Sequence, residues 1–291
     1  MTNIRIIEKV GNNPGKTTIM ITGVHGNEKV NVKLFDRIIP ELRIDNGRVV
    51  FLYANLEAIE QNKRFIDINL NRAFIRELLD DEDNKLLEVQ TAREIIPYLD
   101  NADYLLDLHS SNSPDSKPFV ICEPQSFGLA KSMPCGLITF NWDEFEPGST
   151  EYWMNLQNKV AMGFEGGYLG DSASGLRAEE ALMNFLSLTG NINCAIRRVP
   201  NKKFLRIVSL YKNKESSFGK SREFADFEKL KEKTLIGTEG NKKVYADKGN
   251  ILLFVRDREE LDQECFLIAE EIDKENLLNI KEQDNLFKGG K

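Results

Sequence analysis

The sequence has little histidine, little cysteine and no long hydrophobic run, and each scarcity excludes a class of protein. Of its 291 residues, only two are histidine and four are cysteine. The cysteines are widely spaced without a Cys-x-x-Cys pair, so we expect reduced thiols rather than a disulfide framework or a zinc knuckle. No apolar stretch approaches the roughly 20 residues that a membrane-spanning helix needs, so we expect no membrane partner.

Basic residues are outnumbered by acidic ones. The chain has 46 acidic and 39 basic residues, for a formal net charge of −7. Neutralising phosphates requires a concentrated basic face, so we expect no nucleic-acid partner. The amino-terminal segment 1–9 carries charge where a secretory signal would need an apolar core. We therefore expect a cytoplasmic protein.

The first two-thirds of the sequence alternate strand-like apolar runs with amphipathic segments. The predicted strands are 18–23, 48–53, 103–108, 118–122, 136–140 and 159–164, and the predicted helices are 28–42, 84–99 and 174–189. This alternation predicts an α/β fold with a mixed, largely parallel sheet flanked by helices. After about residue 195, short apolar runs separated by polar turns predict a smaller β-rich domain. We therefore expect two domains, 1–195 and 196–291, with a loop or surface helix over 212–233 and a loose tail at 287–291.

The two histidines each follow a strand-like run. His25 lies in the segment Gly23-Val-His-Gly-Asn-Glu28, and His109 ends the segment Asp107-Leu-His109. Ligand sites in α/β sheets gather at the carboxyl ends of strands. With Glu28 as a local partner and His109 as a distant third ligand, the set matches an open catalytic zinc site that leaves its fourth position to water. The His-x-x-Glu spacing alone is weak and more often belongs to a capping or turn histidine than to a ligand pair.

Other polar residues near these positions have two interpretations. The segment 63–72, Lys-Arg-Phe-Ile-Asp-Ile-Asn-Leu-Asn-Arg, is rich in groups that bind a carboxylate or a polarised carbonyl, but it also fits an ordinary surface loop. Glu165 follows the apolar run 160–164, which favours a site position over one more surface glutamate. Asp107 points to the same side of its strand as His109. It either orients that imidazole or accepts backbone hydrogen bonds.

Four motifs together resemble the succinylglutamate desuccinylase/aspartoacylase family, whose members are relatives of the zinc carboxypeptidases. The motifs are Gly23–Glu28, Arg64 with Asp67–Arg72, Asp107–His109 and Phe164–Gly166, and their order and approximate separation match. The resemblance extends from about residue 15 to 190. It implies a zinc-hydrolase catalytic domain within 1–195, with one Zn²⁺ per chain. It also implies cleavage of an N-acyl amino acid at its amide bond, giving a carboxylate and a free amino acid.

The resemblance assigns roles to single residues. It gives zinc ligation to His25, Glu28 and His109, general-base catalysis to Glu165, oxyanion stabilisation to Arg64, and binding of a substrate carboxylate to Asn71 and Arg72. The segment after the base, Glu165-Gly-Gly-Tyr168, lacks the glycine-proline pattern of some aspartoacylases. The family's substrate-contacting tyrosine has no clear equivalent in the C-terminal region, where Tyr211 and Tyr245 are the candidates.

Two other functions stay open at this point. A carboxypeptidase-like hydrolase of short peptides would use Arg72 for a terminal carboxylate equally well. A non-catalytic zinc-binding or ligand-sensing protein would have no use for Glu165 and Arg64.

We expect the partner to be a small N-acyl amino acid. A homo-oligomer is possible, and a His/His/Glu site also accepts other first-row ions.

Overall fold

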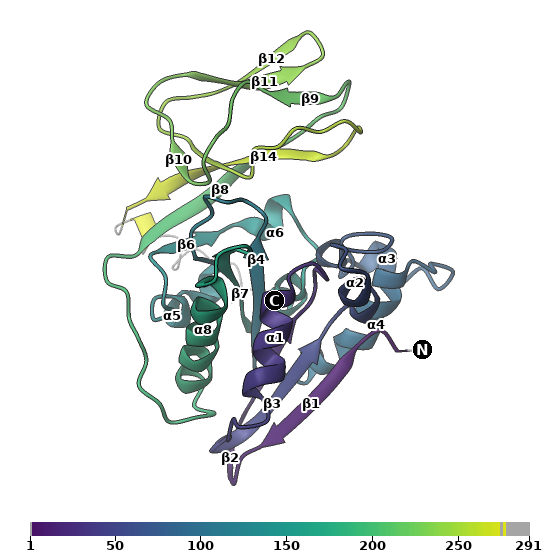
Figure 1. The fold of residues 1–291 in the computed structure, drawn as a ribbon, viewed down its shortest axis with the longest axis vertical. Helices are drawn as coiled ribbons and strands as arrows, with labels where there is room; N and C mark the ends of the chain where they lie inside the picture. The colour runs from purple at the N-terminus through teal and green to yellow at the C-terminus, as the bar shows by residue number, and fades with distance from the viewer. Residues whose placement is uncertain (1, 274–275, 278–291) are drawn as a thin grey trace, which may run out of the picture.

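The computed structural model describes residues 2–273 and 276–277, which form an α/β fold around one large sheet (Figure 1). The strands are β1 (Arg5–Val10), β2 (Asn13–Thr22), β3 (Asn46–Tyr53), β4 (Tyr104–Ser111), β5 (Phe119–Cys122), β6 (Leu137–Phe140), β7 (Val160–Tyr168), β8 (Lys203–Lys212), β9 (Phe218–Lys220), β10 (Glu228–Lys229), β11 (Thr234–Glu239), β12 (Lys242–Ala246), β13 (Ile251–Leu253) and β14 (Glu264–Ile272). The helices are α1 (Lys29–Ile38), α2 (Leu56–Gln61), α3 (Arg76–Leu79), α4 (Leu87–Asp100), α5 (Phe127–Ala130), α6 (Trp142–Phe145), α7 (Thr150–Leu156) and α8 (Ser174–Leu188), with 3₁₀ turns η1 (Leu70–Arg72) and η2 (Pro124–Ser126). Across these described ranges, every helix is too short or too polar to span a bilayer.

The main sheet has eleven strands in the order β1-β3-β2-β4-β7-β5-β6-β8-β14-β13-β10. Strands β3, β2, β4 and β7 run parallel to one another. Antiparallel pairings join β1 to β3 and β5 to β7. The predicted mixed α/β sheet flanked by helices is therefore confirmed, and the six predicted strands correspond to β2 through β7.

The strands at the centre of the sheet bury both of their faces. On β2, Met20 packs into the core beneath α1 and α8, whereas Ile19 and Ile21 pack into the core beneath α4. Successive strand residues point to opposite faces, so a sheet covered on both sides needs apolar residues at every position. This explains why these strands were visible in the sequence as continuous apolar runs. Helix α1 ends at Ile38 rather than 42, because Pro40 has no backbone N–H with which to continue the helical hydrogen bonds.

The C-terminal region continues the main sheet and adds a second one. Strand β8 pairs in parallel with β6, and β14, β13 and β10 follow it, while β12, β11 and β9 form a separate three-stranded sheet. These strands occupy the upper end of the molecule in Figure 1. The β-rich character is confirmed, whereas the division at residue 195 stays a prediction, because the main sheet runs through it.

One prediction in the C-terminal region holds in part. The sequence predicts a loop or a surface helix over the polar segment 212–233, and most of this segment is irregular, but it also contains the short strands β9 and β10. Phe218 of β9 is buried against Ile236 and Phe266, and this apolar contact fixes the segment as a strand. The predicted tail at 287–291 lies outside the described residues.

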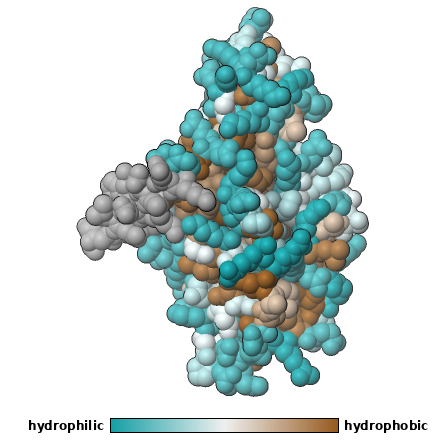
Figure 2. Space-filling view, turned by 90° about the vertical axis from the view of Figure 1, so that its left-hand side faces the viewer, coloured by the Kyte–Doolittle hydropathy of each residue, from teal (hydrophilic) through white to brown (hydrophobic). Residues whose placement is uncertain are grey.

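Hydrophilic side chains cover much of the face drawn in Figure 2, and the hydrophobic patches on it are bordered by polar ones. The large apolar side chains that are most exposed in the described residues lie singly along the chain, with Val10 at 71% and Leu176 at 66%. Isolated exposed apolar residues of this kind are normal on soluble domains.

Candidate metal and active site

The loop after β2 carries His25 and Glu28 to the carboxyl edge of the sheet. Gly23 starts this loop with a φ of +74°, a conformation that side-chain-bearing residues rarely adopt. Gly26 then lies against the backbone of α2, where a Cβ would be only 2.0 Å from the carbonyl carbon of Ala58. Glu28 follows as the residue before the first turn of α1. The loop is thus held between β2, α2 and α1.

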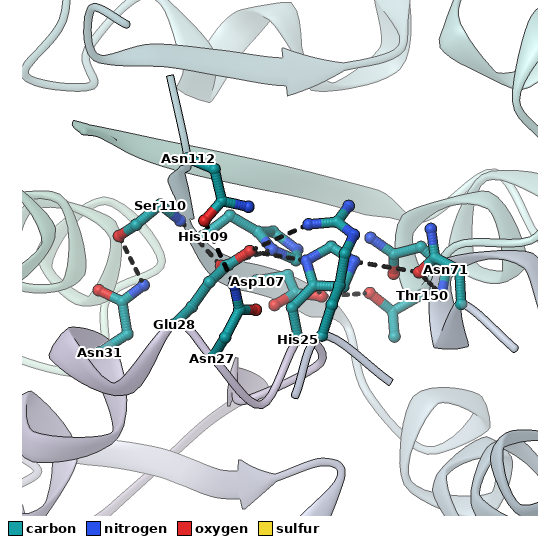
Figure 3. Close-up of polar contacts among 12 residues, drawn as sticks. His25, Asn27, Glu28, Asn31, Asn71, Asp107, His109, Ser110, Asn112 and Thr150 are labelled. Atoms are coloured by element: carbon teal, nitrogen blue, oxygen red, sulfur yellow. Dashed lines mark hydrogen bonds and ion pairs between the residues drawn. The ribbon is translucent and has the colours of Figure 1, made fainter. Parts of the chain in front are cut away.

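The three candidate ligands converge, as Figure 3 shows, with the Glu28 carboxylate facing both imidazole rings. Glu28 Oε1 lies 2.7 Å from His25 Nδ1, and Oε2 lies 3.2 Å from His109 Nδ1. The exposed fractions of His25, Glu28 and His109 are 5%, 2% and 3%. One ligand atom from each lies within 4.8 Å of the others. Two imidazole nitrogens and one carboxylate form a typical catalytic zinc donor set, so these residues fit the metal that the resemblance implies.

A side-chain oxygen lies near the Nε2 atom of each ring, and in the described residues only the contact to His25 is a hydrogen bond. His25 Nε2 lies 3.0 Å from Asn69 Oδ1, and His109 Nε2 lies 3.4 Å from Asp107 Oδ2. Thr150 donates its hydroxyl hydrogen bond to Asp107 Oδ2 at 2.9 Å. With each Nε2 facing an oxygen, each Nδ1 is left to face Glu28, as metal-ligating histidines require. Of the two interpretations of Asp107, the structure favours the orienting one.

The electrostatics of the cluster favour a positive charge between its members. Burial, together with nearby Arg64, lowers the pKa of His25 to about 4, so this ring is neutral. Burial would raise the pKa of Glu28, but the two imidazoles outweigh it and lower this pKa. Burial would lower the pKa of His109, but the carboxylates of Asp107 and Glu28 raise it well above its ordinary value. A cation at this point, whether a proton or a metal ion, is stabilised by the same two carboxylates.

Glu165 lies beside these residues on the neighbouring strand. It is in register with His109 of β4 across the parallel pairing with β7. Its Oε2 atom is buried without a hydrogen-bond partner among the described residues. Burial and the carboxylate of Glu28 raise the pKa of Glu165 to about 7. Arg64 also reaches the cluster, with Nη1 3.7 Å from Glu28 Oε1.

Asn71 and Arg72 line the same cavity, but Arg72 already has carboxylate partners. Its Nη2 lies 2.8 Å from Glu146 Oε1 and 2.8 Å from Glu264 Oε1. Its Nε also donates to Glu264 Oε1, at 3.2 Å. Asn71 Oδ1 is buried and has no hydrogen-bond partner in the described part of the chain. Both residues therefore lie at the site, but the charge of Arg72 is already balanced by Glu146 and Glu264.

The C-terminal region contributes residues to the cavity that sequence reasoning missed. Arg256, Arg258 and Glu264 all line it. The only signal for them was a pair of arginines following the apolar run 251–255, which does not indicate where that run packs. The two tyrosine candidates do not line this cavity. Tyr211 donates its hydroxyl hydrogen bond to Glu239, and Tyr245 is 47% exposed on β12.

Comparison with known proteins identifies the first half of the chain. The model of the succinylglutamate desuccinylase/aspartoacylase catalytic domain matches residues 14–135. An N-acyl-aromatic-L-amino acid amidohydrolase (carboxylate-forming) of Xenopus laevis is 31% identical over 125 residues, which are 40% of this chain and 41% of that protein. A probable aspartoacylase of Acaryochloris marina is 30% identical over 124 residues, 39% of this chain and 41% of that protein. The match thus spans about two-fifths of the length of these curated relatives.

The fold agrees over almost the whole chain. An X-ray structure of a succinylglutamate desuccinylase from Vibrio parahaemolyticus superposes with a TM-score of 0.74 at 21% identity, covering 92% of this chain and 86% of that one. The range 14–135 contains the three candidate ligands and Arg64, whereas Glu165 lies beyond it. Residues 14–135 thus match the catalytic domain of the succinylglutamate desuccinylase/aspartoacylase family, as the first three motifs predicted, and almost the whole chain has a fold similar to that of a solved succinylglutamate desuccinylase.

Proposed function

We propose that the protein is a zinc-dependent hydrolase that cleaves the amide bond of an N-acyl amino acid. The observation that carries this proposal is the convergence of His25, Glu28 and His109, which are buried, offer ligand atoms within 4.8 Å of one another, and lie in the range that matches this family's catalytic domain. The names of the curated relatives, an amidohydrolase and a probable aspartoacylase, support the same reaction class.

In this proposal, His25, Glu28 and His109 hold one divalent ion. Such an ion polarises the scissile carbonyl and lowers the pKa of a bound water toward neutrality. Asn69 and Asp107 keep the two imidazoles in the tautomer that presents Nδ1 to the ion.

Glu165 and Arg64 complete the chemistry. The buried Glu165 carboxylate accepts a proton from the attacking water and returns it to the amide nitrogen, so that the C–N bond breaks and a carboxylic acid and an amine are released. The Arg64 guanidinium donates hydrogen bonds to the carbonyl oxygen as negative charge develops on it. Arg64 lies 3.7 Å from Glu28, and the charges of Glu28 and Arg64 both act on Glu165, so the two groups are close to the proposed metal site.

The contribution of the C-terminal region to the cavity wall favours, in this proposal, a small substrate over a peptide. Residues of the C-terminal region, among them Phe254, Arg256 and Phe266, line it together with the ligand cluster. A peptide needs a groove that is open at both ends, whereas an N-acyl amino acid fits a pocket closed on one side.

Metal analysis combined with activity assays tests the proposal. We expect zinc in the purified protein, hydrolysis of at least one compound in a panel of N-acetyl and N-succinyl amino acids, and loss of hydrolysis with a chelator. Glu28→Gln should lose both the metal and the activity. Glu165→Gln should keep the metal and reduce the turnover number about 10²–10⁴-fold, which is the usual contribution of a general base.

The matched control is Glu60→Gln, an exposed glutamate on α2, which should change neither quantity. Bound zinc without turnover of any acyl amino acid or short peptide would favour a sensor. Turnover of peptides alone would favour the carboxypeptidase-like function. Retention of the metal by Glu28→Gln would contradict the ligand assignment.

A further inference from the structure

Four arginines line the cavity, and they differ in whether their charge is matched. Arg72 is paired with two carboxylates, as described above. Arg64, Arg256 and Arg258 line the same cavity, the first from the loop after α2 and the other two from the segment after β13. Because two carboxylates already match the charge of Arg72, the other arginines are better candidates for binding a substrate carboxylate.

Arg256 has the least compensated charge of the four. Within residues 2–273 and 276–277, its guanidinium makes no hydrogen bond and no ion pair, and the ring of Phe254 lies 5.8 Å away. It is half-buried. Burial lowers the pKa of Arg256, and the like charges of Arg64 and Arg258 lower it further, which outweighs the opposite charges of Asp226 and Glu165. An anion bound among these guanidinium groups would relieve both effects.

The segment that carries Arg256 is held rigidly. Phe254 has a φ of +56°, an uncommon conformation for a residue with a side chain, and its backbone N–H donates to Asp226 Oδ1 at 2.8 Å. The backbone N–H of Arg256 donates to the carbonyl of Cys265 at 2.9 Å, which ties the segment to β14. Strain that the surrounding structure maintains is typical of binding sites. The Arg256 side chain is thus presented from a fixed backbone.

Arg258 is fixed in a similar way. Its Nε donates to the carbonyl of Glu264 at 2.7 Å, and its backbone pairs in both directions with Phe218 of β9. It lies two residues from Arg256, so the two guanidinium groups extend the positive wall of the cavity.

We propose that Arg256, with Arg258 beside it, binds a carboxylate of the substrate, so that the C-terminal region supplies the anion-binding wall of the active site. This inference rests on the proposed function, since every N-acyl amino acid carries an α-carboxylate and an N-succinyl group adds a second one. Arginine suits the task because its planar fork binds a carboxylate through two hydrogen bonds. Apolar residues such as Phe254 and Leu267 line the cavity nearby, so leucine derivatives are suitable probes.

Calorimetric titration of the metal-free protein tests this assignment, because it requires no catalysis. One pair of probes, N-acetyl-L-leucine and N-acetyl-L-leucinamide, differs only in the α-carboxylate. A second pair, N-succinyl-L-leucinamide and N-butyryl-L-leucinamide, differs only in the acyl carboxylate. We expect Arg256→Gln to bind the acid of one pair about tenfold or more weakly than the wild type does, with its neutral partner unaffected. The affected pair identifies which carboxylate Arg256 binds.

The control variant is Arg206→Gln, which removes an exposed arginine of β8 that does not line the cavity and should leave binding unchanged. Arg256→Lys keeps the positive charge and should retain part of the affinity. Such partial retention would show that the weaker binding of Arg256→Gln does not come from misfolding. Equal weakening of acid and amide, an unchanged affinity, or no preference of the wild type for either acid would overturn the assignment. Binding of an acid without turnover by the zinc-loaded protein would instead overturn only the proposed hydrolysis.

Discussion

At the scale of single residues, the environment of Arg72 is the clearest case in which partners decide a role. Its charge lies between Glu146 and Glu264, whose side chains are 11% and 35% exposed. Burial raises the pKa of Glu146 to about 7. Burial would also raise the pKa of Glu264, but Arg72 lowers it to about 2. The three groups therefore form one network in which the arginine stabilises the carboxylates.

We predict that Arg72→Met destabilises the protein by about 1–3 kcal/mol in urea unfolding at pH 7. This is less than the roughly 3–5 kcal/mol for a fully buried pair, because solvent screens the partly exposed groups. Glu264 titrates below its ordinary value, so its contribution is present above about pH 4.5 and is lost as the pH falls toward 2. The difference between wild type and variant should therefore narrow below pH 4.5.

Two further variants check the Arg72 prediction. Arg37→Met breaks a surface pair with Glu179, whose side chains are 57% and 31% exposed, and should cost about 0–1 kcal/mol. Adding Glu264→Gln to the Arg72→Met chain should recover part of the lost stability, because it removes one unpaired carboxylate. A loss no larger than that of Arg37→Met would show that the network contributes little.

The sequence predicts the parts of the site that depend on local spacing, and it does not predict those that depend on contacts between distant segments. His25 and Glu28 are three residues apart, and the two histidines were the only ones available, so the ligand set followed from composition and local spacing. The pairing of Arg72 with Glu264 spans 192 residues, and no local pattern encodes it. The unmatched charge of Arg256 was hidden for the same reason, since it depends on where the segment after β13 packs.

At the scale of elements, the loop between β2 and α1 depends on its close approach to α2. A Cβ at Gly26 would meet the Ala58 carbonyl carbon at 2.0 Å and the Ile59 nitrogen at 2.3 Å, and both are backbone atoms. The Gly26 N–H also donates to the carbonyl of Arg64 at 3.3 Å. This glycine therefore sets the position of the ligand loop relative to α2 and to the arginine that follows it.

We predict that Gly26→Ala lowers the zinc affinity about tenfold or more and destabilises the protein by about 1–3 kcal/mol, because the loop has to move away from α2. Competition with a chromogenic chelator measures the affinity, and thermal unfolding measures the stability. Gly128→Ala is the matched control, since nothing lies within 4 Å of its added Cβ on α5. It should leave metal binding unchanged, and equal behaviour of the two variants would refute the steric argument.

Elements were predictable where burial on both faces produced continuous apolar runs, as on β2 and β4. Strand β1 was missed because it lies at the edge of the sheet with alternating exposed positions and three charged residues. Short helices such as α3 and α6, of four residues each, carry too few residues to show a helical period. The strands β9 and β10 are likewise short, and their only strong signal is the buried Phe218.

At the scale of the whole molecule, the question is whether the predicted halves act as one unit. Strand β8 joins the main sheet through β6, with Leu137 paired to Lys203. The apolar core around Trp142 also draws on both halves, since it includes Phe119 of β5 and Leu205 of β8. Arg256 places a C-terminal side chain in the active-site cavity. These contacts favour a single cooperative unit over two independent domains.

The chain's two tryptophans allow a direct test. Trp142 lies in the core shared with β8, and Trp153 lies in the core beneath α4, with exposed fractions of 7% and 8%. Trp153→Phe leaves only the first probe, and Trp142→Phe leaves only the second. Within each variant, we expect the urea midpoint from tryptophan fluorescence to coincide with the midpoint from far-ultraviolet circular dichroism, as a two-state transition requires.

Comparing two signals within one variant removes the effect of the substitution on stability, since both midpoints shift together. Both tryptophans lie within residues 1–195, but only Trp142 packs in the core that includes Leu205 of the C-terminal half. If the halves unfold separately, the Trp142 fluorescence midpoint will therefore differ from the dichroism midpoint, and the division at residue 195 will be a true domain boundary. Coincident midpoints would mean that the C-terminal wall of the cavity cannot detach while the sheet stays folded. The geometry around Arg256 would then be fixed by the same transition that fixes the ligand cluster.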